Sequence, residues 1–140
     1  MARILVVEDD PDVALIYQTL LKHHGHDVHV SNDGHHALSV LESVDPDLLV
    51  VDIGLPGKVD GWSVLEYVTQ QAGHPPCIVV TALAEPEHRQ RARELACRAY
   101  LSKPVSTGTL LAAVDSAVEG PGGGGRGRDV RGRAPAPGLS

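Results

Sequence analysis

The sequence predicts an α/β fold in which five parallel strands alternate with five helices. Short runs of aliphatic, largely β-branched residues recur without polar alternation, which is typical of strands buried on both faces of a parallel sheet. Three runs are pronounced, at residues 4–7, 48–51 and 78–80, and two weaker ones lie at 27–30 and 99–101. Helical segments separate them, and such an alternation folds into a parallel sheet with right-handed crossovers.

The first helix has recognisable ends, and we expect it from about Pro11 to His24. Asp10 is placed to cap it, Pro11 suits its first turn and Gly25 suits its exit. Its apolar positions follow a helical spacing and should face the core: Val13, Ile16, Leu20 and Leu21. Further helices are expected near residues 34–43, 62–72, 86–96 and 107–118. Ser106 can cap the last, whose inner face would carry Leu110, Leu111, Val114 and Val118.

Composition divides the chain into one folded domain, residues 1–119, and a tail, residues 120–140. The tail holds eight Gly and three Pro among 21 residues and has almost nothing apolar to bury, so we expect it to be disordered. The first 119 residues contain 8 Lys and Arg against 17 Asp and Glu. This acidic body argues against nucleic-acid binding by the folded domain.

Two cysteines, Cys77 and Cys97, are too few and too far apart for a disulfide framework or a zinc site, and they fit reduced thiols. No stretch approaches the roughly 20 apolar residues of a membrane span. The apolar run near Met1 is too short for a signal peptide. We therefore expect a soluble cytoplasmic protein.

Ionisable and hydroxyl side chains follow the predicted strands at their carboxyl ends. Glu8 and Asp9 end the first run, Asp52 ends the third, Thr81 ends the fourth, and Lys103 follows the fifth. Ligands of open parallel sheets bind outside the carboxyl ends of the strands. The sequence therefore predicts that three carboxylates, one hydroxyl and one ammonium converge at one edge.

This set of side chains suits phosphoryl chemistry. Three neighbouring carboxylates repel one another, and a hard divalent cation such as Mg²⁺ or Mn²⁺ offsets that repulsion. A carboxylate can attack phosphorus to form an acyl phosphate. The charge that develops on the phosphoryl oxygens would be met by the metal, the Lys103 ammonium and the Thr81 hydroxyl.

Four motifs at these strand ends carry a family resemblance: Val7-Glu8-Asp9-Asp10, Asp52-Ile53-Gly54-Leu55-Pro56, Thr81-Ala82 and Lys103-Pro104. In this order and spacing the chain resembles the receiver domain of bacterial two-component response regulators over about residues 2–118. The resemblance implies a stand-alone receiver with a doubly wound, flavodoxin-like fold of strand order 2-1-3-4-5.

The resemblance also implies roles for the site residues. Asp52 would be the phosphoacceptor. Asp9 would bind Mg²⁺ directly, Glu8 would act largely through water, and the Gly54 carbonyl would be a further metal ligand. Lys103 would pair with the phosphoryl group. The chain would then be a signalling phosphoacceptor and not an enzyme, beyond its own phosphorylation and dephosphorylation.

A switch is implied for Thr81 and Tyr100, since Thr81 would hydrogen-bond to the phosphoryl group and Tyr100 would swing inward. The phosphoryl donor would be a sensor histidine kinase or a His-phosphotransfer protein. Output would pass to a downstream protein target, and Arg89, Arg91 and Arg93 make an acidic partner the expectation.

Three features depart from the family pattern. The loop from Leu55 to Gly61 is one residue longer than usual. Ala96 replaces a helix-ending Gly, which predicts a reshaped helix end. The acidic residues that support a symmetric dimer in the largest DNA-binding subfamily are missing around residues 97–99, so we expect a monomer.

Two other functions remain open. A phosphohydrolase with an Asp nucleophile and magnesium would use the same edge, although the well-known superfamily of that type needs a second Asp where this chain has Gly54. An interaction module could keep the fold and switch without phosphate, against the intact set of site residues. In the tail, four arginines resemble nucleic-acid-contacting segments, but a solvated tail is the simpler interpretation: Arg126, Arg128, Arg131 and Arg133.

Some candidates have an ordinary structural explanation. Asp10 is better explained as a helix cap than as a third metal ligand. Tyr100 could be a half-buried strand aromatic. Histidines near the exit of the first helix suit its dipole better than they suit a transition-metal site: His23, His24, His26 and His29.

Overall fold

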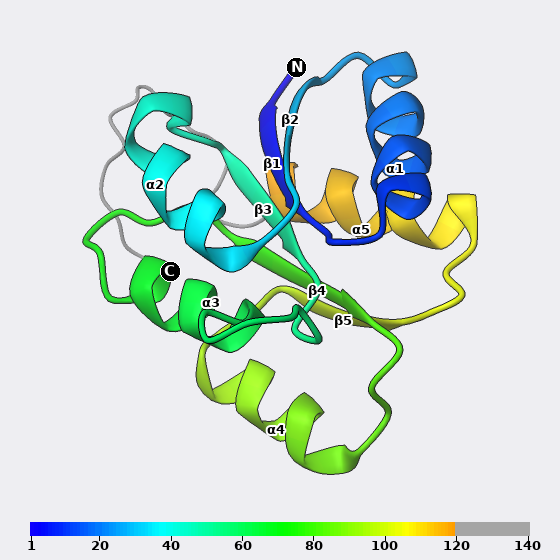
Figure 1. The fold of residues 1–140 in the computed structure, drawn as a ribbon. Coiled ribbons are helices and arrows are strands. Elements are labelled where there is room, and N and C mark those ends of the chain that lie inside the picture. The colour runs from blue at the N-terminus through cyan, green and yellow to red at the C-terminus, as the bar shows by residue number, and fades with distance from the viewer. Residues whose placement is uncertain (120–140) are drawn as a thin grey trace.

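The computed structural model describes residues 1–119, over which five strands alternate with five helices (Figure 1). The expected tail, residues 120–140, lies outside the described residues. The strands are β1 (Arg3–Val7), β2 (Asp27–Ser31), β3 (Leu48–Val51), β4 (Cys77–Thr81) and β5 (Ala99–Ser102). The helices are α1 (Pro11–His23), α2 (Gly34–Val44), α3 (Gly61–Thr69), α4 (Pro86–Glu94) and α5 (Thr107–Glu119).

The sheet has the order β2-β1-β3-β4-β5, and every neighbouring pair is parallel. The predicted fold class is therefore confirmed. Helices α1 and α5 cover one face of the sheet, and α2, α3 and α4 cover the other (Figure 1). Strand β2 lies on one side of β1, and β3 lies on its other side. The direction in which strands are added therefore reverses between β1 and β3, and ligands of such sheets bind in the crevice at the carboxyl ends of these two strands.

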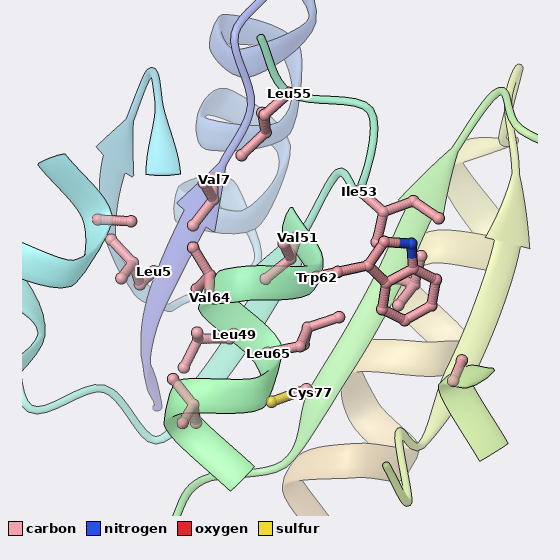
Figure 2. Close-up of a cluster of buried hydrophobic side chains, with 14 residues drawn as sticks. Leu5, Val7, Leu49, Val51, Ile53, Leu55, Trp62, Val64, Leu65 and Cys77 are labelled. Carbon is pink, nitrogen blue, oxygen red and sulfur yellow. The ribbon is translucent and has the colours of Figure 1, made fainter. Parts of the chain in front are cut away.

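Each central strand supplies side chains to two separate cores, because successive residues of a strand point to opposite faces. On the α2–α3–α4 side, Leu5, Val7, Leu49 and Val51 pack toward α3, as Figure 2 shows. On the α1–α5 side the core is built from the alternate strand residues and from helix residues: Ile4, Val6, Leu48, Val50, Leu21, Leu110 and Val114.

Two predicted helix caps are confirmed. The Asp10 carboxylate accepts hydrogen bonds from the backbone N–H groups of Asp12 and Val13, which supports its interpretation as a cap. The Ser106 hydroxyl accepts from the N–H of Thr109. These bonds satisfy N–H groups that a helix start leaves without partners.

The expected core position of Ile16 is wrong, because its side chain is 61% exposed. The buried residues of α1 are Ala14, Tyr17 and Leu21. Ile16 precedes Tyr17 by about 100° around the helix, which turns it away from the sheet. The apolar spacing therefore located the helix correctly but included one residue from its outer side.

The end of α4 keeps the left-handed turn that usually requires glycine. Ala96 has a φ of 59°, a conformation that costs a residue with a Cβ. The N–H of Ala96 donates to the Arg93 carbonyl, and that of Cys97 donates to the Ala92 carbonyl. The expected reshaping of this helix end is thus not observed.

Both cysteines are free thiols, as predicted. Cys77 is buried, and burial raises its pKa; burial also raises the pKa of Cys97 to about 11. Both thiols are therefore protonated at neutral pH and are poor nucleophiles. Within residues 1–119, no helix combines the length and the apolar character needed to span a membrane.

Candidate functional site

The predicted site residues come together at the carboxyl edge of the sheet. Glu8 and Asp9 follow β1, Asp52 follows β3, Thr81 is the last residue of β4, and Lys103 follows β5. One carboxylate oxygen from each of the three acidic residues lies within 4.8 Å of the others. In the described part of the chain, this trio is the one group of acidic, histidine or cysteine side chains with the spacing of a metal site.

Lys103 bridges two of these carboxylates. Its Nζ lies 2.6 Å from Glu8 Oε1 and 2.8 Å from Asp52 Oδ2. Glu8 is only 2% exposed and Asp52 only 8%, whereas Asp9 faces solvent. The Lys103 side chain thus reaches from the β5 end across the edge to the β1 and β3 ends.

Burial and hydrogen bonding have opposite effects on the pKa values of Glu8 and Lys103. Burial raises the pKa of Glu8, and the Lys103 hydrogen bond lowers it by less. For Lys103, burial lowers the pKa, but the bonds to Asp52 and Glu8 outweigh it, and the pKa is raised. Lys103 is therefore a cation at neutral pH, and it neutralises only one of three neighbouring carboxylates. The remaining negative charge fits a divalent cation.

Backbone N–H groups orient the same carboxylates. The N–H of Gly54 donates to Asp52 Oδ1 at 2.8 Å, and the N–H of Asp10 donates to Glu8 Oε2 at 3.2 Å. The Asn32 amide, which sequence reasoning missed, donates to the Glu8 carbonyl at 3.4 Å. With Lys103 on Oδ2, each Asp52 oxygen has a donor, and the carboxylate is held in one orientation.

Gly54 leaves open space between Asp52 and Thr81. A Cβ at this position would lie 3.4 Å from Asp52 Oδ1 and 3.9 Å from Thr81 Oγ1. A side chain there would occupy the volume that both groups face. The Gly54 carbonyl, the expected metal ligand, belongs to this same turn.

Two further glycines set the loop around Asp52. A Cβ on Gly61 would overlap the carbonyl oxygen of Asp52 and the Cα of Ile53. A Cβ on Gly34 would overlap the carbonyl of Val59, which lies in the lengthened loop. This loop therefore packs against the start of α2, and α3 starts directly against the Asp52 backbone. Sequence reasoning named Gly61 only as the end of the lengthened loop, and it did not single out Gly34.

Thr81 and Tyr100 are linked through Leu83, another residue that the sequence did not indicate. Thr81 is 1% exposed, and its Oγ1 accepts from the N–H of Leu83 at 3.3 Å. The Tyr100 hydroxyl donates to the Leu83 carbonyl at 2.5 Å. Burial raises the pKa of Tyr100, so this phenol is protonated and able to donate. The two expected switch residues thus bond to the backbone N–H and the backbone carbonyl of the same residue, Leu83.

Comparison with known proteins decides the family. The model of the response regulator receiver domain matches residues 4–115, which is most of the chain. The chain belongs to the response regulator receiver family. Receivers are signalling phosphoacceptors of two-component systems and bind Mg²⁺ at an acidic pocket, and this receiver carries the acidic cluster of Glu8, Asp9 and Asp52 at that edge.

The receiver is similar both to proteins about twice its matched length and to a protein that it matches from end to end. It is 36% identical over 112 residues to the alkaline phosphatase synthesis transcriptional regulatory protein PhoP of Bacillus subtilis, covering 80% of this chain but 46% of that protein. It is 30% identical over 122 residues to the protein PilH of Pseudomonas aeruginosa, covering 86% of this chain and 100% of PilH. The chain thus spans about half the length of the first relative and the full length of the second.

Solved structures show the same fold. A CheY-like response regulator receiver domain protein from Methanospirillum hungatei aligns with a TM-score of 0.80 and 26% identity, covering 85% of this chain and 94% of that one. The BeF3-activated N-terminal receiver domain of RstA from Klebsiella pneumoniae aligns with a TM-score of 0.77 and 30% identity, covering 84% and 99%.

Proposed function

We propose that this receiver accepts a phosphoryl group on Asp52 in the presence of Mg²⁺ or Mn²⁺. The observation that carries the proposal is the fixed orientation of the Asp52 carboxylate between the Lys103 ammonium and the Gly54 N–H. The donor would be a histidine-phosphorylated sensor kinase or a His-phosphotransfer protein.

In the proposed step, an Asp52 oxygen attacks phosphorus while the phosphorus–nitrogen bond of phosphohistidine breaks. The imidazole nitrogen keeps the electron pair, and the product on Asp52 is an acyl phosphate. The metal, held by Asp9, Asp52 and the Gly54 carbonyl with Glu8 acting through water, would neutralise charge on the phosphoryl oxygens. Lys103, already 2.8 Å from Asp52, would pair with one phosphoryl oxygen.

The Thr81 hydroxyl would bind another phosphoryl oxygen and start the signal. Because Oγ1 now accepts from Leu83, a turn of Thr81 toward Asp52 would change that contact and release the loop that also receives the Tyr100 hydroxyl. Tyr100 would then swing inward and alter the surface of α4, β5 and α5. A ligand shifts such an equilibrium only by binding one packing better than the other.

The output in this proposal is protein binding by a monomeric, cytoplasmic receiver formed by residues 1–119, with no nucleic-acid contact by the folded domain. An acidic partner was expected for the arginines of α4, yet Arg89 and Arg91 are engaged within the chain. Sedimentation of the beryllofluoride-treated protein tests the oligomeric state, since a tight symmetric dimer would contradict a monomeric output.

The central experiment treats the protein with acetyl phosphate and Mg²⁺ and measures intact mass. One added phosphoryl group is expected, with loss of labelling when EDTA removes the metal. Asp52→Asn should remain unlabelled, whereas a matched Asp60→Asn variant should be labelled like the wild type. Equal labelling of Asp52→Asn would contradict the assignment of the phosphoacceptor.

A further inference from the structure

The lengthened loop between β3 and α3, residues 55–60, starts and ends beside Asp52. Its first residue, Leu55, is buried in the same cluster as Val7 at the end of β1, and Figure 2 shows both side chains at this end of the sheet. After the loop the chain returns to Asp52, because a Cβ on Gly61 would overlap the Asp52 carbonyl oxygen. Both ends of the loop are therefore held at the acidic edge.

The middle of the loop stands clear of the rest of the protein. Pro56, Gly57 and Lys58 are all exposed. Gly57 has a φ of 91°, and a Cβ there would meet no atom within 4 Å. Val59 then returns to the body of the protein, where its carbonyl packs against Gly34 at the start of α2. The three exposed residues thus form a short projection, the loop tip, which is anchored on both sides.

Lys58 is a free cation at an edge that is otherwise acidic. It makes no hydrogen bond or ion pair within the described residues, whereas Lys103 is bonded to Glu8 and Asp52. The helices α1, α2 and α3 all begin at this edge, and an aspartate caps each start. Acidic side chains therefore gather here: Glu8, Asp9, Asp10, Asp33, Asp52 and Asp60. An approaching phosphodonor is itself an anion, and the negative field of these carboxylates repels it unless cations offset that field.

We propose that Lys58 is a specificity-determining residue that draws anionic phosphodonors to the Asp52 edge and weakens the binding of the metal cation there. This inference rests on the proposed phosphorylation of Asp52. An ammonium at the loop tip attracts the negative oxygens of the donor and repels Mg²⁺, because both effects come from the same charge. Donors with more negative charge on the phosphoryl group gain most, so labelling by acetyl phosphate should depend on Lys58 more than labelling by phosphoramidate does.

The test compares Lys58→Glu with Lys22→Glu in the 140-residue chain. The two substitutions change the net charge equally. Lys22 is exposed in the last turn of α1, roughly 16 Å along the helix axis from the end that begins at the acidic edge. Lys22→Glu is therefore the matched control, and Lys58→Gln removes the charge without reversing it.

The first measurement is the rate of labelling by acetyl phosphate at saturating Mg²⁺ and low ionic strength. The second-order rate constant should fall roughly 2- to 5-fold in Lys58→Glu, fall less in Lys58→Gln, and stay at the wild-type value in Lys22→Glu. The difference should shrink at high ionic strength, because salt screens exposed charges. A wild-type rate constant in Lys58→Glu, or a loss that high salt leaves unchanged, would refute the attraction.

The second measurement is the Mg²⁺ concentration that half-saturates the untreated protein, followed by the fluorescence of Trp62. It should fall roughly 2- to 5-fold in Lys58→Glu, so that metal binding tightens while labelling slows. Damage to the loop structure would weaken both processes, and the opposite signs therefore separate the charge of Lys58 from a structural role. Weaker Mg²⁺ binding in Lys58→Glu than in Lys22→Glu would overturn the proposal.

The proposed function and the role of Lys58 can fail separately. If the wild type takes no phosphoryl group on Asp52, the proposed function is wrong, and the Mg²⁺ titration still decides whether the charge of Lys58 acts at this edge. If the wild type is labelled on Asp52 and both measured constants are unchanged in Lys58→Glu, the role of Lys58 alone is refuted.

Discussion

Gly61 lies directly against the backbone of Asp52, so that the first residue of α3 and the expected phosphoacceptor share one packed contact. No side chain separates them, because a Cβ at position 61 would overlap the Asp52 carbonyl oxygen. The start of α3 therefore packs against the backbone that carries the Asp52 carboxylate.

Gly61→Ala should disturb both folding and phosphorylation. The added methyl group must displace the backbone of Asp52 and Ile53, and overpacking of this kind typically costs about 1–3 kcal/mol of unfolding free energy. Urea unfolding measures that loss, and acetyl phosphate labelling should slow in parallel. Gly108→Ala in α5 is the matched control, since a Cβ there meets no atom within 4 Å. Equal effects of the two substitutions would contradict the importance of this contact.

Ala96→Gly should stabilise the protein. Ala96 has a φ of 59°, where a Cβ is strained and glycine is not. The relief of strain exceeds the entropy that glycine adds to the unfolded chain, and we expect a gain of roughly 0.5–1 kcal/mol in the unfolding free energy. The exposed Ala112 in the interior of α5 is the control, because Ala112→Gly should be destabilising. Urea midpoints that move in the same direction would refute the expectation.

Asp9 should contribute more than Glu8 to Mg²⁺ affinity. The Glu8 carboxylate is buried and is already bonded to Lys103. Asp9 is exposed at the edge of the sheet, and among the described contacts Lys103 bonds to Glu8 and Asp52 but not to Asp9. The fluorescence of Trp62 can follow the titration, because Trp62 is the residue next to Gly61, which contacts the Asp52 backbone. Asp9→Asn should raise the midpoint of the Mg²⁺ titration more than Glu8→Gln does. The reverse order would mean that Glu8 is the direct ligand.

Stability should fall at acid pH through His26. Its Nδ1 accepts from the N–H of Ala2 at 3.1 Å, and its Nε2 is buried without a hydrogen-bond partner in the described residues. Burial lowers the pKa of His26 below its usual 6.5, and the charges of the N-terminal amine and His24 act in the same direction. The unfolded chain therefore binds this proton more readily.

The free energy of unfolding therefore decreases as the pH falls. The contribution of neutral His26 is fully present above pH 6.5 and is lost as the pH falls below it. Urea midpoints at pH 7.5 and pH 5.5 measure the loss, and His26→Gln should reduce it. The exposed His35 provides the control His35→Gln, for which the pH dependence should match that of the wild type. An unaltered slope in His26→Gln would exclude His26 as the cause.

The sequence was sufficient for the sheet and for the members of the acidic edge. Apolar runs mark buried strands, and the residues after Val7 and Val51 must then meet where the strands end. It was insufficient for contacts that depend on how the helices sit on the sheet. The exposure of Ile16 and the approach of Gly61 to Asp52 follow from helix rotation and crossing, which a one-dimensional pattern does not encode.

The same reason explains why the contacts of Leu83 with Thr81 and Tyr100, and of Arg89 with Tyr100, were overlooked. Leu83 acts through its backbone groups, which every residue has. Arg89 was interpreted as part of a charged surface, and its position over Tyr100 depends on the placement of α4 against β5. Side-chain identity therefore predicted which residues gather at the edge of the sheet. The contacts that connect Thr81 with Tyr100 and α4 depend on three-dimensional packing and could not be predicted from it.

Because α4 places a single described residue, Ala92, in one of the two cores, opening of this helix exposes less buried apolar surface than opening of a central strand. Backbone amide protons of α4 should accordingly exchange with deuterium through local opening, whereas those of β1, β3 and β4 require global unfolding. The free energy that opens α4 is therefore expected to be smaller than the free energy of global unfolding. The central strands can set the lifetime of the native state while one lightly anchored helix is remodelled many times within it.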